Sequence, residues 1–499
     1  MHWWGREKSD ESRGVPGRRG GATPRVWQRF MARFGGRTGY KSTLRGHEAP
    51  LRPIPYAFGA LILVGALFLR LPLAHNPGRS ISSLDALFLS TSATCVTGLS
   101  PVNVAEVFNG FGQAVLLVLI QAGGIGIMTA GTFFLVLTGN RLSLAHEQSI
   151  AGAFGQLRSV RPGDIFAYAC VVVLVTELAG AVALFSLISQ QWPEQPVGIA
   201  LWQAVFHSVS AFCNAGISIF PEGLARWKNV PALLGVVDAL VITGGIGLLT
   251  LVNLRYYRWW RRDSRKRGSL SVQTRLSVVL TVLLLAGGTL LTLALEWNRT
   301  LAAAHSFGER LSWAFFHSTM TRTAGFSVVD LAQMHPATLQ ISIVLMFIGG
   351  APGSMAGGIK TSTTAVLVLA AWAALRRRSE VNLFGRRVPG SQTSAAVMIL
   401  LLATASLLLA VILLMITEGG SLAVHARHGW LGVVFEAVSA FGTVGLSADV
   451  TPLLTSPGKA IIIALMFLGR VGPLMLAMHL CRPLVPWHVR YPEESISLG

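Results

Sequence analysis

The sequence predicts an all-α integral membrane protein made of four pseudo-fourfold helix–pore-loop–helix repeats. Eight transmembrane helices and four re-entrant pore helices would surround one central pore. Three observations predict this fold. Only 13% of the 499 residues are charged, whereas soluble domains carry about 25%. Several apolar runs reach the roughly 20 residues that a helix needs to cross a bilayer. A short glycine-centred motif also occurs four times.

The basic residues are clustered, although the formal net charge of +19 could also suggest a nucleic-acid partner. Five segments between apolar runs hold 30 of the 41 Lys and Arg residues: 1–52, 141–163, 255–275, 376–392 and 482–499. The positive-inside rule places all five on the cytoplasmic side, both termini included. None carries a nucleic-acid-binding module, so no nucleic-acid partner is expected. The first segment has no early apolar core, which is typical of a disordered cytoplasmic tail rather than a signal peptide.

Between the five cytoplasmic segments the chain crosses to the outside and returns four times, which requires eight spanning helices. We expect them at 53–73, 111–138, 164–190, 231–254, 274–296, 338–375 (broken), 393–417 and 457–481. Each outer linker holds an apolar stretch too short to span, as in a re-entrant segment: 82–94, 198–213, 309–321 and 430–441. The chain then divides into a tail (1–52), four repeats (53–140, 141–254, 255–375 and 376–481) and a second tail (482–499).

The four short stretches lead into one motif. It reads SATCVTGLS (92–100), SAFCNAGIS (210–218), TMTRTAGFS (319–327) and SAFGTVGLS (439–447). Ser or Thr stands six residues before each central glycine, an apolar residue follows the glycine, and Ser stands two residues after it. A second small-residue cluster follows 24 to 28 residues later: GGIG (123–126), GGIG (244–247), GGAPG (349–353) and GRVG (469–472). Internal repeats of this kind place a site at the repeat interface.

The repeated motif suits a dehydrated monovalent cation. Glycine can adopt the positive φ that turns successive carbonyls the same way, and carbonyls from four segments can replace the hydration shell of potassium. The candidate selectivity filter comprises Val96, Thr97, Gly98, Asn214, Ala215, Gly216, Thr323, Ala324, Gly325, Thr443, Val444 and Gly445. Thr443-Val444-Gly445 matches the start of the TVGYG potassium filter. The other three segments match it less closely.

These motifs together resemble the Ktr/Trk potassium-uptake superfamily and, within it, the KtrB-like membrane (pore) subunits. The resemblance rests on FIGGAPGSMAGGIKTST (347–363), RTAGFS (322–327), SAFCNAG (210–216), EAVSAFGTVGLS (436–447) and MFLGRVGPL (466–474), and covers about residues 53–481. It implies potassium transport across the cytoplasmic membrane, sodium as an activating ion and no organic cofactor. It also implies a homodimer and a cytosolic, KtrA-like ring of RCK-type nucleotide-binding regulatory subunits, for which the basic linkers 255–267 and 376–387 are candidate docking surfaces.

Charged residues at membrane depth suggest how flux is controlled. Arg470 lies on the fourth inner helix, where a buried cation is costly unless it faces a cavity or a partner. We expect Arg470 to act as an electrostatic barrier below the filter. The third inner helix is broken by glycine and proline, and the resemblance implies a gating loop there. Its candidate residues are Gly349, Gly350, Gly353, Gly357, Gly358 and Lys360. Arg322 is expected to pair with an acid behind the filter, for which Glu436 is one candidate.

Three rival functions remain open at the level of sequence. An enzyme is disfavoured because no metal-protease motif or nucleophile–base arrangement stands out. A coupled secondary transporter is disfavoured because such proteins usually have inverted repeats, whereas these four repeats run parallel. A sodium-selective pore of the same architecture is the third rival.

Overall fold

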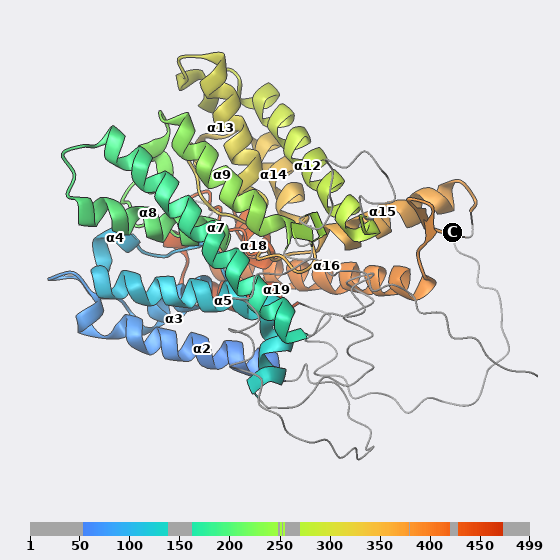
Figure 1. Cartoon of the computed structure of the whole chain (residues 1–499), viewed down its shortest axis with the longest axis horizontal. Coiled ribbons are helices and arrows are strands. Elements are labelled where there is room, and N and C mark those ends of the chain that lie inside the picture. The colour runs from blue at the N-terminus through green and yellow to red at the C-terminus, as the bar shows by residue number, and fades with distance from the viewer. Residues whose placement is uncertain are drawn as a thin grey trace, which may run out of the picture. The chain divides into compact units, whose positions relative to one another are not determined.

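The computed structural model describes residues 53–137, 162–247, 250–251, 253–254, 270–378, 380–419 and 428–472. The predicted tails 1–52 and 482–499, and most of the linkers 141–163 and 255–275, lie outside the described residues. The described part is helical except for short turns and one hairpin, β1 (Asn382–Leu383) and β2 (Arg386–Arg387). The all-α prediction is therefore confirmed for the described chain (Figure 1).

The helices occur in the predicted order of outer helix, pore helix and inner helix. The outer helices are α2 (Pro53–Arg70), α7 (Pro162–Gln191), α12 (Val272–Glu296) and α16 (Gly390–Glu418). The short helices at the predicted re-entrant stretches are α3 (Ser83–Thr94), α8 (Val197–Phe212), α13 (Phe307–Met320) and α18 (Trp430–Gly442). The inner helices are α5 (Gly110–Leu137), α9 (Pro231–Ile246), the pair α14 (Pro336–Phe347) and α15 (Thr361–Leu375), and α19 (Ser456–Val471). A one-turn helix, α4 (Val104–Val107), precedes α5.

Three of the described helices are long and apolar enough to cross a membrane by length and composition. They are Ala169–Gln191, Val272–Glu296 and Gly390–Glu418. Seven further apolar helices of 10–17 residues accompany them. Short helices are what a pore architecture requires, because re-entrant segments and interrupted inner helices do not span the full bilayer.

The pore helices start where the sequence supplies capping side chains. The Ser82 hydroxyl accepts a hydrogen bond from the Asp85 backbone N–H at the start of α3. The Ser306 hydroxyl accepts one from the Glu309 backbone N–H at the start of α13. A Ser three residues before an acidic residue is the capping-box pattern, which satisfies a free N–H of the first turn. Local sequence thus fixes where these two re-entrant helices begin.

Successive repeats pack against one another, and the last packs against the first. The helix contacts that join them are α5 with α8, α9 with α13, α14 with α18, and α19 with α3. Polar contacts also cross each seam. Among them, Trp202 Nε1 donates to Gln113 Oε1 (2.8 Å), Trp313 Nε1 donates to the Lys228 carbonyl (2.9 Å), His428 Nε2 lies 2.8 Å from the Ala332 carbonyl, and Lys459 pairs with Asp85 (2.7 Å). The four repeats therefore close into a ring.

The inner helices differ from the prediction at their inner ends. The third is broken between Phe347 and Thr361, as its glycines and proline predict. The predicted helix over 231–254 is interrupted, because α9 ends at Ile246 and Gly247 has a φ of +89°, whereas residues 250, 251, 253 and 254 are again helical. The predicted span 457–481 likewise stops early, since α19 ends before Gly472 at φ +91°; residues 473–481 lie outside the described part. Glycine adopts a positive φ of this kind at little steric cost.

Candidate functional site: four glycine segments in a ring

The four candidate filter segments have the same backbone conformation. Each central glycine has a positive φ: Gly98 at +103°, Gly216 at +66°, Gly325 at +71° and Gly445 at +90°. The residue two positions earlier is also left-handed in every repeat: Val96 at +56°, Asn214 at +59°, Thr323 at +66° and Thr443 at +49°. Non-glycine residues rarely take this conformation. Its recurrence at one position in four repeats indicates a shared backbone requirement, which the motif alone did not reveal.

The four glycines lie against one another in cyclic order. A β-carbon placed on Gly98 would lie 2.6 Å from the carbonyl oxygen of Ala215 in the next repeat. A β-carbon on Gly216 would lie 2.6 Å from the Ala324 carbonyl oxygen, and one on Gly325 would lie 2.5 Å from that of Val444. One on Gly445 would collide with the Thr97 carbonyl, which completes the circle. Only glycine fits these four positions, and the carbonyl of the preceding residue faces the neighbouring repeat each time.

Hydroxyl groups hold the segments in this conformation. In the first and fourth repeats the Ser six residues before the glycine accepts its backbone N–H: Gly98 N to Ser92 Oγ is 3.0 Å, and Gly445 N to Ser439 Oγ is 3.1 Å. In the second repeat Ser210 Oγ instead donates to the Ile217 carbonyl at 2.8 Å. The Ser six residues before the glycine therefore stabilises the turn in three repeats. In the third, Thr319 Oγ1 donates back to Phe315 within its own pore helix.

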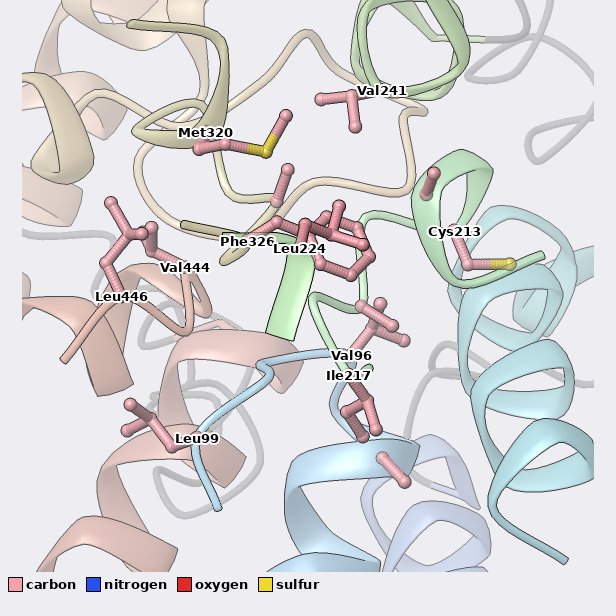
Figure 2. Close-up of a cluster of buried hydrophobic side chains, with 14 of the residues drawn as sticks. Val96, Leu99, Cys213, Ile217, Leu224, Val241, Met320, Phe326, Val444 and Leu446 are labelled. Carbon is pink, nitrogen blue, oxygen red and sulfur yellow. The ribbon is translucent and has the colours of Figure 1, made fainter. Parts of the chain in front are cut away.

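Apolar side chains anchor the segments from behind. The residue after each glycine is almost fully buried: Leu99 and Leu446 are 1% exposed, Ile217 is 2% exposed and Phe326 is 3% exposed. Figure 2 shows these four side chains in one cluster with Val96 and Val444, which come from the segments themselves. Burying side chains on one side of a segment leaves its backbone as the polar surface on the other. The backbone is therefore the part available to a cation.

The second small-residue cluster lets the inner helices approach the ends of the pore helices. A β-carbon on Gly123 would collide with the carbonyl of Thr94, four residues before the filter glycine. Gly244 meets the Phe212 carbonyl and Gly469 meets the Phe441 carbonyl in the same way. The negative C-terminal end of the pore helix therefore lies against the inner helix in the first, second and fourth repeats.

The third repeat replaces this packing with a loop, residues 348–360, that crosses towards the second repeat. Gly349 N donates to Ile359 O at 2.8 Å and Thr361 N to Gly350 O at 3.0 Å, which ties the two ends of the loop together. Ala351 N donates to Gly245 O at 3.0 Å and Met355 N to Gly244 O at 3.2 Å. The loop thus covers the last carbonyls of α9. Two of its glycines need left-handed backbone: Gly353 at φ +71° and Gly358 at φ +65°.

Arg470 and Lys360 fix this loop below the filter. Arg470 is 5% exposed. Its Nη1 donates to Met355 O at 2.5 Å and its Nη2 to Gly123 O at 3.0 Å. One guanidinium therefore joins the first, third and fourth repeats. Lys360 Nζ donates to Ala356 O at 2.5 Å, a hydrogen bond between two residues of the loop itself. A β-carbon on Gly357 would collide with Thr443 Oγ1, so the loop also touches the filter.

The predicted pairing of Arg322 with an acid is wrong. Arg322 Nη2 donates to the Gly349 carbonyl at 3.2 Å, at the start of the loop. Glu436 instead accepts a hydrogen bond from Ser447 Oγ at 2.8 Å and another from Thr451 Oγ1. Arg322 is bound by a backbone oxygen rather than a carboxylate. Its own carbonyl accepts from Asn214 Nδ2 at 3.4 Å, so Arg322 also links the second and third filter segments.

Two carboxyl groups stand just beyond the filter on the outer loops. Asp330 follows Gly325 by five residues and Asp449 follows Gly445 by four, and both are exposed. Burial of part of its surface, with Asp330 beside it, raises the pKa of the Asp449 carboxyl. Neither carboxyl group belongs to the repeated motif, which ends at Ser327 and Ser447. Negative charge at this end raises the local concentration of cations.

Comparison with known proteins places this arrangement in a family. The family model described as TrkH, cation transport protein, matches residues 53–482. That range holds all four filter segments, the loop and Arg470. The chain belongs to the TrkH family of cation transport proteins. The family members named below are transport proteins rather than enzymes, which confirms the non-enzymatic prediction.

Individual relatives match this TrkH-family chain over nearly its full length. The Ktr system potassium uptake protein B of Vibrio alginolyticus is 37% identical over 92% of this chain and 97% of its own length. The potassium/sodium uptake protein NtpJ of Enterococcus hirae is 33% identical over 92% and 99%. The crystal structure of the potassium transporter TrkH from Vibrio parahaemolyticus shares the fold, with a TM-score of 0.63, 18% identity and coverage of 88% and 87%.

Proposed function

We propose that this TrkH-family protein takes up potassium across the cytoplasmic membrane through a gated, channel-like pore. The proposal rests on the ring of Gly98, Gly216, Gly325 and Gly445. A β-carbon added to any of these glycines would contact the carbonyl oxygen of the residue that precedes the glycine of the next repeat. Carbonyl rings of this kind discriminate among monovalent cations by replacing water ligands. The candidate filter is the set of twelve residues that end at the four glycines.

The gate in this proposal is the loop 348–360 together with Arg470. Support comes from the hydrogen bond between Arg470 and Met355 and from the contact of Gly357 with Thr443 directly below the filter. A cation that leaves the filter meets a fixed positive charge and a closed backbone turn. Opening requires the loop to exchange these hydrogen bonds for others, which a regulatory partner could drive.

Control by other components is part of the proposal. The family resemblance motivates a homodimer, sodium stimulation and a cytosolic RCK-type nucleotide-binding ring. The similarity to a protein named as part of a Ktr system supports a multi-component system. The five basic segments would face the cytoplasm, together with both termini. Of the linkers expected to dock a regulatory ring, 376–387 is described except for residue 379, whereas 255–267 lies outside the described residues.

A sodium-selective or sodium-coupled transporter is the second candidate, because one matching relative is named a potassium/sodium uptake protein. Growth of an uptake-deficient bacterium on limiting potassium, with and without a regulatory subunit, tests the main proposal. Rescue by the chain supports potassium uptake, and failure to rescue under any sodium concentration contradicts it. Ion competition in liposomes that contain the purified chain separates the two candidates. Fast flux without a fixed stoichiometry supports a channel, whereas tight stoichiometric coupling supports a carrier.

A further inference from the structure

A short basic hairpin connects α15 to α16. In its two strands Asn382 pairs with Arg387 and Leu383 with Arg386. The two turn residues, Phe384 at φ +49° and Gly385 at φ +74°, are both left-handed. This is the type I′ geometry that favours a tight two-residue hairpin. The hairpin is therefore a defined structure that presents Phe384 at its tip.

The hairpin surface, which we define as residues 376–389, carries five arginines and one glutamate. Within the described chain only Arg387 has an acidic partner, Glu380 at 2.9 Å. All five arginines are exposed. A cluster of exposed arginines with so few internal partners favours an anionic ligand outside the chain.

Exposed apolar side chains lie next to these charges. Trp372 is 54% exposed, Leu375 is 79% exposed and Phe384 is 47% exposed. The Arg376 guanidinium lies 4.7 Å from the centre of the Trp372 ring. Trp beside Arg at a helix end is typical of the boundary between hydrocarbon and headgroups. Because Trp372 lies on α15 and α16 begins at Gly390, both ends of the hairpin surface adjoin helices of the membrane-embedded bundle.

We propose that the hairpin surface binds the phosphate headgroups of anionic phospholipids in the inner leaflet. The arginines would bind phosphate oxygens, and Phe384 would enter the interface between headgroups and acyl chains. This inference rests on the orientation in the proposed function, with the basic segments on the cytoplasmic side. A lipid fits better than a soluble protein, because the surface mixes unpaired arginines with exposed aromatic side chains at the end of a membrane helix.

Native mass spectrometry of the purified full-length chain tests the lipid site without any ion flux. The measured quantity is the ratio of affinities for phosphatidylglycerol and phosphatidylcholine. Each of Arg378→Gln and Arg386→Gln should lower this ratio about fivefold, and the double variant should lower it further. The matched control is Arg275→Gln, an exposed arginine in the first turn of α12. An equal loss in the control would overturn the proposal, since it would indicate a generally basic surface.

A second measurement separates lipid from protein as the ligand. A purified cytosolic regulatory subunit is added to wild-type and to Arg378→Gln/Arg386→Gln protein in nanodiscs that contain phosphatidylglycerol. Reduced lipid preference with normal subunit binding supports the lipid site. Unchanged lipid preference with lost subunit binding would show that the hairpin docks a protein, and would overturn the inference. Because neither measurement needs transport, failure of the lipid site is distinguishable from failure of the proposed potassium uptake.

Discussion

The four segments of the filter ring share one backbone conformation, whereas the parts of the inner helices directly beneath the ring, which we call the lower layer, differ from one another. In the ring, four segments of different sequence share left-handed backbone at the same two positions. Beneath it, the four inner helices all differ. The first continues through Gly126, the second stops at Gly247, the third opens into the loop 348–360, and the fourth places Arg470 where the other three repeats have glycine.

From this difference we expect the ring and the lower layer to have separate roles in transport. A cation on the axis is bound equally from four sides only if the four backbones are equivalent, so the ring tolerates side-chain variation but not backbone variation. A gate needs two arrangements of nearly equal free energy, which an asymmetric layer can provide. We therefore expect changes in the ring to alter which ion passes and whether any ion passes at all, and changes in the lower layer to alter only how fast the ion passes.

The largest expected effect comes from Gly445→Ala. The added methyl group would collide with the Thr97 carbonyl at a residue whose φ is +90°. A misplacement of about 1 Å at a reacting centre can cost about 100-fold in rate, and we expect a loss of that order in rubidium uptake. Gly287→Ala is the matched control, because nothing lies within 4 Å of its added β-carbon. If both variants transported normally, the ring would not be the filter.

Shortening the gate loop should have the next largest effect, in the opposite direction. Deletion of residues 353–356 removes the Met355 carbonyl that Arg470 binds and the backbone that covers α9. We expect flux into liposomes to rise about tenfold, because a charge-assisted hydrogen bond stabilises the closed state by about 1.5–3 kcal/mol. Stimulation by an added regulatory subunit should also weaken. Unaltered stimulation would count against this loop as the gate.

Arg470→Ala should raise flux several-fold, somewhat less than the deletion does. The substitution removes two hydrogen bonds and a buried positive charge, but leaves Lys360 bonded to Ala356. Arg470→Lys should be intermediate, since Lys keeps the charge without the planar fork that reaches two carbonyls. The comparison is made by rubidium uptake at matched protein density. Equal flux in all three proteins would remove Arg470 from the mechanism.

The smallest expected effect concerns the seam between the fourth and first repeats. Lys459 and Asp85 form an ion pair at 2.7 Å, with side chains 17% and 15% exposed. Asp85→Asn should lower the free energy of unfolding by about 1 kcal/mol, while ion preference stays unchanged. Thermal unfolding in detergent measures the loss, and the exchange Asp85→Lys/Lys459→Asp should restore part of it. A change in ion preference would show that this seam shapes the filter.

Much of the fold could be predicted because the signals are local. The half-apolar stretches and the Ser and Gly spacing located all four pore helices to within a few residues. The Gly and Pro residues between 349 and 358 predicted the broken helix. Gly247 could not be predicted as a helix end, since the same GGIG sequence at 123–126 stays within α5. Identical tetrapeptides take different conformations here because backbone N–H groups of the gate loop bind the carbonyls of Gly244 and Gly245 in the second repeat.

The partners of the buried arginines could not be predicted for a different reason. Both Arg322 and Arg470 bind backbone carbonyls, at Gly349, Met355 and Gly123. Every residue carries a backbone carbonyl, so the residue type does not reveal which carbonyl accepts a hydrogen bond. A carboxylate partner can be sought in the sequence, because only Asp and Glu side chains carry one. The sequence therefore suggested Glu436 as a partner of Arg322. The Glu436 carboxylate instead accepts hydrogen bonds from Ser447 and Thr451.

The division between ring and lower layer is tested most directly by one paired measurement. Flux and the preference for potassium over sodium are measured together in liposomes for wild-type protein and Arg470→Ala. We predict a several-fold higher flux with an unchanged ion preference, because the four filter segments are untouched. A collapse of the preference at Arg470→Ala would contradict the account, since it would place ion selection in the layer beneath the glycine ring.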